Sequence, residues 1–209
     1  MPTPPFQARL PQAQAVLQFW LGDAMEVGWP LENRSKLWFG GGAELDATVR
    51  MRFGALVDDA MQGGLVDWEH HPLDNLALIL LLDQFTRNMY RGQPKAFAGD
   101  ARAQKLVTTA LARGWDNALP LAGTVFLYMP LMHAEDIALQ DECVRCFENL
   151  AARAPSERHT DLQGNVDFAR KHRDIIAQFG RFPYRNAALG RESGPAELVF
   201  LRDGPRFGQ

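Results

Sequence analysis

The sequence predicts an all-α protein, an array of about eight helices in which neighbours pair antiparallel. Apolar residues recur at spacings of three and four, which places them on one face of a helix. No stretch alternates polar and apolar residues over the length of a strand. Glycine and proline separate the helical segments by short connections, which favour antiparallel neighbours.

The composition is that of a globular protein. The chain has 209 residues, of which 46% are hydrophobic and 22% charged, a balance typical of a folded domain. We therefore expect a single helical domain over residues 1–209, with flexible ends at residues 1–10 and 203–209. The net charge of −3 argues against nucleic acid as the main partner, because nucleic-acid-binding domains are usually basic.

Three further features bear on location. No apolar run reaches the length of about 18 residues that a membrane-spanning helix needs, so we expect no membrane partner. The N-terminal stretch lacks the apolar core of a signal peptide, and two cysteines are too few for a disulfide scaffold. The sequence therefore predicts a cytoplasmic protein with reduced cysteines.

The N-terminal third contains two amphipathic helices. The segment Gln12–Leu21 carries Val16, Phe19 and Trp20 and is followed by a glycine, which predicts a short helix. The segment Glu44–Met61 repeats apolar residues at spacings of three and four and is followed by a pair of glycines. We expect both segments to turn an apolar face toward a core.

The segment Leu76–Leu82, with the sequence LALILLL, is apolar on every side. It is rich in leucine rather than in β-branched residues, and its polar flanks favour helix, so we predict a buried helix and not a strand. Pro72 is well placed as a first helical residue. This central helix should therefore begin at Pro72 and end at Gly92.

The remaining helices are bounded by common start and stop residues. Asp100 is predicted as an N-cap, and Pro130 as the first residue of a new helix. Gly180 should end a helix at its C′ position. The expected helices are Ala101–Arg113, Leu121–Met129, Pro130–Ala152, one that opens the stretch Phe168–Arg191, and Ala196–Leu201.

The loop after Gly180 is rich in arginine. Pro183 disfavours the α conformation at Phe182, so we expect an extended turn over Phe182–Arg185. Guanidinium groups this close repel one another unless an anion lies between them, and their forks match carboxylate and phosphate groups. The loop is therefore predicted as an anion clamp or as a solvated loop with salt bridges to nearby acids. Its polar residues are Arg181, Arg185, Asn186 and Arg191.

Two further polar sets lie beside strongly apolar sequence. Within the first, an acid precedes an arginine by four residues, the favourable order for an ion pair along a helix. Within the second, an imidazole and a carboxylate three residues apart are suited to acid–base work or to holding a metal, on one face of the helix begun at Pro130. Each set is predicted as a pocket wall or as a structural polar face. The first set is Asp83, Gln84, Arg87, Asn88 and Arg91, and the second is His133, Glu135, Asp136 and Gln140.

Cys143 and Cys146 have the spacing of a redox C-x-x-C motif. Such a motif normally opens a helix after a strand. Here the pair lies in mid-helix beside Leu139 and Leu150, which continue the same apolar stripe. We therefore expect both thiols to be packed in a core.

Six motifs along the chain form a recognisable set. They are WF at Trp38, LALILLLDQFTRNMYRG at Leu76, AFAGD at Ala96, FLYMPLMHAED at Phe126, HRDIIAQFGRFPYRN at His172 and LGRES at Leu189. Together they resemble the bacterial domain-of-unknown-function family numbered 924, over nearly the whole chain. The resemblance implies an all-helical fold similar to a tetratricopeptide-like superhelix, although a clean repeat of about 34 residues is not found. It implies no established activity.

The chain departs from the family pattern at two positions. Thr86 stands where the family usually has proline, and Tyr184 where it usually has histidine. A histidine replaced in this way is a poor candidate for an obligatory ligand or base. The recurring polar positions that the resemblance implies are Asp83, Gln84, Arg87, Asn88, His133, Glu135, Asp136, His172, Arg181, Arg185, Asn186 and Arg191.

The leading functional hypothesis is a pocket for a small anionic ligand. Four arginines would hold the anion and three amides would orient it; they are Arg87, Arg181, Arg185 and Arg191, with Gln84, Asn88 and Asn186. His133 and Glu135 would serve as acid and base, which would make the protein a hydrolase. Asp83, Asp136 and His172 complete the predicted ligand-binding residues, and the cofactor and the oligomeric state are left open.

Two alternatives remain. His133 and His172, with Glu135 or Asp136, would form a metal site if they converge to ligand distances of about 2 Å. His172 would otherwise be a hydrogen-bonded core residue. A helical-repeat scaffold would bind a peptide or protein along a concave face, and the polar sets would then be structural ion pairs.

Overall fold

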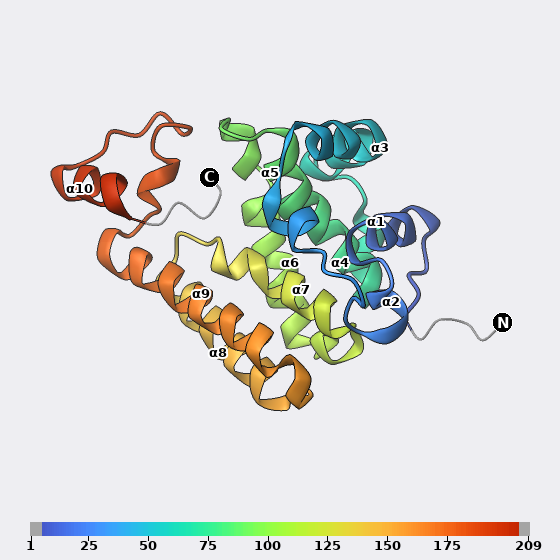
Figure 1. The fold of residues 1–209 in the computed structure, drawn as a ribbon. Helices are drawn as coiled ribbons and strands as arrows, with labels where there is room; N and C mark the ends of the chain where they lie inside the picture. Colours follow the sequence, from blue (N-terminus) through green and yellow to red (C-terminus); the bar gives the residue numbers. More distant parts are fainter. Residues whose placement is uncertain (1–5, 205–209) are drawn as a thin grey trace. The chain divides into compact units, whose positions relative to one another are not determined.

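The computed structural model describes residues 6–204, and their regular structure is entirely helical, as predicted (Figure 1). The chain divides into two compact units. The N-terminal unit comprises the described part of Met1–Arg91 together with Lys95–Pro130, and the C-terminal unit the described part of Gly92–Pro94 and Leu131–Gln209. A single domain over residues 1–209 stays a prediction. The expected flexible ends fall mostly on residues 1–5 and 205–209, which lie outside the described residues.

The N-terminal unit is built around the central apolar helix. Every residue of Leu76–Leu82 is buried, which confirms the predicted central helix. Trp20, Phe85 and Phe126 meet edge to face in the core beside it. The helices of this unit are α1 (Pro11–Leu21), α2 (Ala24–Val27), α3 (Ala43–Met61), α4 (Pro72–Leu80), α5 (Thr86–Met89), α6 (Asp100–Ala112) and most of α7 (Leu121–Met132).

The central helix contains a π-helical turn. α4 continues through Leu81–Phe85, which has π-helical hydrogen bonding, into α5. The first polar set therefore begins at a π-turn, a feature that often occurs at functional positions. At the other end, Asp74 accepts the backbone N–H groups of Arg9 and Leu10, which fixes the start of α1 against α4.

The prediction of Asp100 as an N-cap is wrong. Asp100 is the first residue of α6, and Gly99 stands at the N-cap position. Gly99 precedes it, and a Cβ atom there would lie 2.3 Å from the Leu82 carbonyl oxygen. The start of α6 therefore approaches the central helix too closely for any residue but glycine at position 99.

The prediction that Pro130 begins a new helix is also wrong. α7 runs through Pro130 and ends at Met132. The next helix, α8 (Ile137–Arg153), starts seven residues later than Pro130 and is capped by Asp136. Because a proline near the end of a helix removes only one of its hydrogen bonds, α7 accommodates it. His133, Asp136 and Gln140 therefore do not share a face of one helix.

The C-terminal unit contains a long antiparallel pair, α8 and α9 (His159–Phe179), and a shorter helix, α10 (Pro195–Asp203) (Figure 1). Ion pairs from Arg170 to Glu148 and from Arg173 to Asp141 cross between α8 and α9 at 2.7 Å and 2.9 Å. The residue numbers rise on one helix as they fall on the other, which confirms the antiparallel order for this pair.

Two features of the α8–α9 pair agree with the predictions from the sequence. Cys143 and Cys146 are both buried, as expected for packing residues, and burial raises the pKa of the Cys143 thiol well above its ordinary value. α9 ends at Gly180, whose backbone is left-handed at φ 68° and whose N–H donates to the Ile176 carbonyl. The predicted glycine stop is confirmed.

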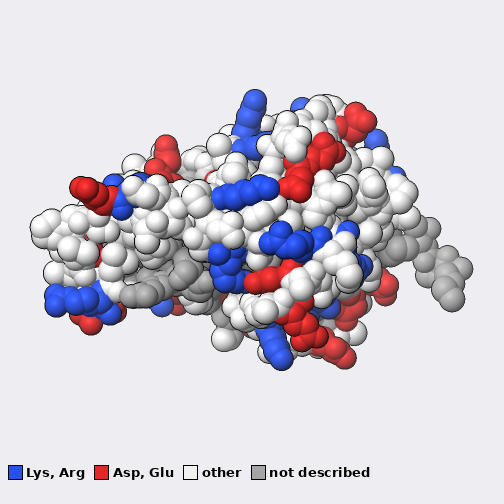
Figure 2. All heavy atoms as spheres, turned by 90° about the horizontal axis from the view of Figure 1, so that it is seen from above, with Lys and Arg blue, Asp and Glu red and all other residues white. Residues whose placement is uncertain are grey.

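The described surface mixes both signs of charge. Figure 2 shows basic and acidic side chains lying among one another on one face, in keeping with the small net charge. Among residues 6–204, no helix combines the length and the apolar character needed to cross a bilayer.

Candidate functional site

The first polar set forms an ion-pair network within the N-terminal unit. Arg87 Nη1 lies 3.0 Å from Asp83 Oδ1, which confirms the predicted pair along the helix. The same guanidinium makes two hydrogen bonds to the Asp100 carboxylate, at 2.9 Å and 3.0 Å. Gln84 Nε2 donates to Asp83 Oδ2 at 2.6 Å. Asp83 is only 1% exposed, so this network secures a buried charge.

The last two residues of the first set, Asn88 and Arg91, make hydrogen bonds to α3. Asn88 Nδ2 donates to Asp46 at 3.0 Å, and Arg91 donates to both oxygens of that carboxylate at 3.1 Å and 3.3 Å. Asp46 was not among the predicted residues. It lies in the first turn of α3, where an acid is also favoured by the helix dipole. Its role as a hydrogen-bond partner of Asn88 and Arg91 therefore could not be distinguished in the sequence.

His133 of the second set lies near His172 in the C-terminal unit, and His172 in turn packs against Phe182 of the arginine-rich loop. We call His133, His172, Phe182 and Arg185 the Phe182 cluster. The two imidazole rings are 6.4 Å apart, the His172 ring lies 5.7 Å from Phe182, and the Arg185 guanidinium lies 4.5 Å from the Phe182 centroid. His133, His172 and Arg185 are 9%, 4% and 4% exposed. Three groups able to carry positive charge are thus buried together.

The orientation of His172 is fixed by its own helix. Its Nδ1 atom lies 2.8 Å from the Phe168 carbonyl oxygen. A carbonyl oxygen only accepts hydrogen bonds, so Nδ1 carries the proton and Nε2 is the basic nitrogen of the neutral ring. The choice between a core histidine and a ligand stays open, because this bond is compatible with both.

The loop after Gly180 is not extended throughout. Phe182 has extended dihedral angles, as predicted from Pro183, but Pro183–Arg185 forms a short 3-10 turn. The Arg185 N–H donates to the Phe182 carbonyl at 3.0 Å, and the Arg191 N–H to the Asn186 carbonyl at 2.8 Å. The loop thus has internal backbone hydrogen bonds that fix its shape.

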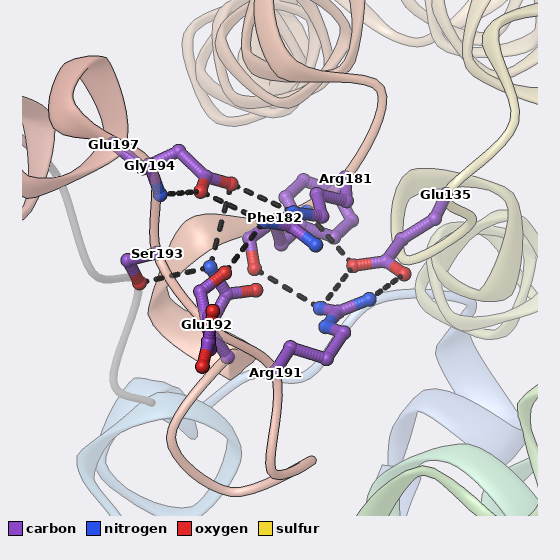
Figure 3. Close-up of polar contacts among 9 residues, drawn as sticks. Glu135, Arg181, Phe182, Arg191, Glu192, Ser193, Gly194 and Glu197 are labelled. Atoms are coloured by element: carbon purple, nitrogen blue, oxygen red, sulfur yellow. Dashed lines mark hydrogen bonds and ion pairs between the residues drawn. The ribbon is translucent and has the colours of Figure 1, made fainter.

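Glu135 accepts three hydrogen bonds from this loop (Figure 3). Arg191 Nη1 and Nη2 donate to its two oxygens at 2.7 Å and 2.9 Å, and the Phe182 N–H donates at 2.8 Å. Burial raises the pKa of Glu135, but the hydrogen bonds from Arg191 and Phe182 outweigh it, so the pKa is lowered. Glu135 is therefore held ionised.

A second glutamate holds the other side of the loop (Figure 3). Glu197 accepts two hydrogen bonds from Arg181, at 2.7 Å and 2.8 Å, one from Asn186 at 3.3 Å, and one from the Gly194 N–H at 2.7 Å. The bonds from Arg181, more than offsetting burial, lower the pKa of Glu197 to about 2, with further help from Gly194 and Asn186. Glu197 was not among the site residues predicted from the sequence, although a proline followed two residues later by an acid is a common pattern at the start of a helix.

The structure therefore divides the predicted site residues into two groups by unit. Residues of the second set and of the arginine-rich loop meet in the C-terminal unit. Asp136 instead caps α8, by accepting the N–H groups of Ala138 and Leu139 at 2.8 Å and 3.1 Å. Gln140 instead donates to the carbonyls of Met132 and Ala134. The first set, from Asp83 to Arg91, has its described partners within the N-terminal unit.

Two clefts lie apart from these residues. One, of about 570 Å³, is lined by Leu10–Gln12 and Leu65–Trp68 in the N-terminal unit. The other, of about 790 Å³, lies between α8 and α9 beside Gly164. Within the described chain, no three His, Cys, Asp or Glu side chains are grouped so that they could share a metal ion. The metal hypothesis therefore has no support from the geometry.

Comparisons with known proteins agree with this fold. Residues 16–205 match the family model described as "Bacterial protein of unknown function (DUF924)". The chain is also similar to the solved structure of a protein of unknown function from Agrobacterium tumefaciens, with 34% sequence identity and a TM-score of 0.75; the match covers 92% of this chain and 97% of that one. No curated protein matches significantly. The chain belongs to the DUF924 family of bacterial proteins of unknown function.

Proposed function

We propose that the C-terminal unit binds a small anionic ligand at the Phe182 cluster. The observation that carries the proposal is the burial together of two imidazoles and one guanidinium from three separate segments. His172 and Arg185 lie against the Phe182 ring, and the His133 ring lies 6.4 Å from that of His172. Burying such groups costs free energy, and clusters of buried titratable groups are enriched at functional sites. Imidazolium and guanidinium groups both donate hydrogen bonds to anions.

The other arginines of the loop have a different role in this proposal. Arg181 and Arg191 each make two hydrogen bonds to a carboxylate of the same chain. Asn186 also joins the Glu197 group. We assign these residues to a frame that shapes the loop, and the ligand contacts to His133, His172 and Arg185. The first polar set is assigned to the network of the N-terminal unit.

Hydrolysis at this site would use the histidines. Glu135 is ionised and bonded on both oxygens, so it is poorly suited to give up or take a proton in a reaction at neutral pH. The Nε2 atom of His172 is the basic nitrogen of a ring whose orientation is fixed. We therefore propose His172 and His133, rather than Glu135, for any proton transfer.

A thermal-shift screen with phosphorylated and carboxylated metabolites tests the binding proposal. A ligand that binds only the folded state raises the melting temperature by mass action. We expect one class of anion to raise it in the wild type, and the rise to be lost in His172→Gln and reduced in Arg185→Lys. His159→Gln and Arg173→Lys, changes on an exposed part of α9, should keep it. A rise that persists unchanged in both cluster variants would contradict the proposal.

A helical-repeat scaffold for a peptide or protein partner is the second candidate. It is favoured by the bidentate pairing of Arg181 and Arg191 with carboxylates of the same chain, which is what structural ion pairs would look like. This candidate predicts a flat response to every anion in the screen, together with a lower melting temperature for Glu135→Gln. Immobilised protein should then retain a peptide partner, and a stabilising small anion would count against the scaffold.

A further inference from the structure

Segment 182–191 offers three N–H donors to one carboxylate. Arg191 Nη1 and Nη2 and the Phe182 backbone nitrogen all lie 2.7 Å to 2.9 Å from the Glu135 oxygens (Figure 3). Two parallel bonds from a guanidinium fork match the plane of a carboxylate, and a third donor fixes its position. These donors form a site complementary to a carboxylate, which Glu135 occupies.

The occupant comes from a different part of the chain. Glu135 lies in the link between α7 and α8, 47 residues before Phe182 and 56 before Arg191. The donors belong to the loop that follows α9. The carboxylate and its binding groups are therefore separate segments, and one can in principle leave the other.

The donor loop has its own supports. Arg191 N–H donates to the Asn186 carbonyl, and the Leu189 N–H to the Arg185 carbonyl. On the other side, Arg181 is held by Glu197 and by the Glu192 carbonyl. Since these bonds do not involve Glu135, the loop backbone that carries Arg191 and the Phe182 N–H should keep its shape when the carboxylate is absent. Arg191 Nη2 also lies 3.4 Å from the Phe182 carbonyl oxygen, a contact that does not need Glu135.

The electrostatic surroundings favour an anion at this place. The lowered pKa of Glu135 reflects attraction to Arg191 and Arg185 in addition to its hydrogen bonds. The hydrogen bonds to Glu197 raise the pKa of Arg181, and attraction to the Glu135 charge adds to this rise. The site therefore stabilises the ionised form of a carboxylate.

We infer that segment 182–191 is a carboxylate-binding site and that Glu135 is its tethered occupant, which the carboxylate of a small organic acid replaces when the α7–α8 link withdraws. The inference goes beyond the proposed function, because the donors are Arg191 and the Phe182 N–H rather than the side chains of His133, His172 and Arg185. A tethered carboxylate has a high effective concentration, so free acids compete poorly in the wild type.

Chemical rescue with acetate tests the inference. Glu135→Ala removes the equivalent of one acetate ion from the side chain and leaves the donors in place. We expect acetate to raise the melting temperature of this variant and not that of the wild type, with sodium chloride at equal ionic strength as the reference. A dissociation constant of about 10 mM and about 100 mM acetate give a rise of about 3 °C.

Two controls connect the effect to the site. Glu135→Ala/Arg191→Ala lacks the guanidinium fork and should lose the rescue. Glu148→Ala removes a carboxylate that pairs with Arg170 on an exposed part of the α8–α9 pair, and acetate should not stabilise it. Rescue of all three variants alike, or of none, would overturn the inference.

Loss of folding would not obscure the answer. If Glu135→Ala is unfolded in buffer, recovery of its helical circular dichroism signal on adding acetate supports the inference. No recovery there, and no response in Glu135→Ser measured in parallel, would overturn it and leave Glu135 as a plain structural ion-pair partner. The result is independent of the thermal-shift screen with anions, because that screen tests the roles of His172 and Arg185 in proteins that retain Glu135.

Discussion

Two glutamates decide the chemistry of the arginine-rich loop at the residue scale. Glu135 holds Arg191, and Glu197 holds Arg181, each through two hydrogen bonds. Such bidentate pairs are short and directional, so they fix the guanidinium groups more firmly than single contacts would. The loop can therefore carry three arginines close together, of which Arg185 lies over the Phe182 ring.

The pKa of Glu197 makes the stability of this loop depend on pH. Its pKa is about 2 in the folded protein, below its ordinary value of 4.5. A lowered pKa stabilises the fold at pH values above the ordinary value, and that contribution is lost as the pH falls toward the folded value. We expect Glu197→Gln to be less stable than the wild type at pH 7, and the difference to shrink between pH 4.5 and pH 2.

Urea unfolding at a series of pH values measures this effect. The control is Glu148→Gln, which removes one partner of an exposed ion pair in the same unit, where little change in stability is expected. A gap between wild type and Glu197→Gln that stays constant, or widens, as the pH falls through this range would show that Glu197 does not act as an ionised group.

The residue scale also shows what the sequence could predict about the site. The arginine loop and an ion pair from Glu135 or Asp136 to one of its arginines could be proposed, because buried charges need partners. The choice of Glu135 over Asp136 could not, since it depends on where α8 begins. The pairing of Glu197 with Arg181 could not be predicted. The two residues are 16 positions apart, and residue spacing indicates a contact only within one or two turns of a helix.

At the scale of elements, the first residue of a helix depends on which of several possible start residues the chain uses. Pro130 and Asp136 both mark possible starts, and the structure uses Asp136. The aspartate offers a side-chain acceptor for two N–H groups, whereas proline offers only a suitable φ angle. Because α8 begins after Asp136, His133 and Glu135 lie in the link between α7 and α8. From this link, Glu135 accepts hydrogen bonds from the loop after α9.

Asp136→Ala tests the importance of the cap. Removing an N-cap side chain costs about 1 kcal/mol, so we expect the free energy of unfolding to fall by about that amount, as measured by urea denaturation. Asp174→Ala is the matched control, because the Asp174 side chain on α9 is 72% exposed. An equal effect of the two substitutions would mean that the cap contributes nothing specific to α8.

The central helix was the most predictable element. A run of seven apolar residues fixes its burial on all sides without reference to any partner. Its π-helical turn at Leu81–Phe85 was not predictable, because the sequence pattern of such a turn differs little from that of an α-helix. Pattern thus specifies that this helix is buried, and packing specifies its local winding.

Leu78→Ala tests the central helix. Leu78 is fully buried, whereas Leu31 in the same unit is 77% exposed. Truncating a buried leucine costs about 2–5 kcal/mol through lost burial and the cavity left behind. We expect Leu78→Ala to lower the free energy of unfolding by that amount and Leu31→Ala to change it little. Similar values for the two variants would contradict the central position of α4.

At the scale of the whole molecule, the family and the all-α class follow from the sequence alone, whereas the site depends on contacts between distant segments. The chain and its relative from Agrobacterium tumefaciens share 34% identity over most of their lengths. A tetratricopeptide-like superhelix remains a prediction, as does a single domain. The central claim about the molecule is that the Phe182 cluster receives an anion.

The most direct test of this claim is an NMR titration of protein labelled with ¹⁵N at histidine, using inorganic phosphate as the probe. The chain has five histidines, His70, His71, His133, His159 and His172. Anion binding at the cluster predicts saturable shifts of the His133 and His172 imidazole resonances, while those of His70, His71 and His159 stay in place. Uniform small shifts at all five, or saturable shifts confined to other histidines, would contradict the claim.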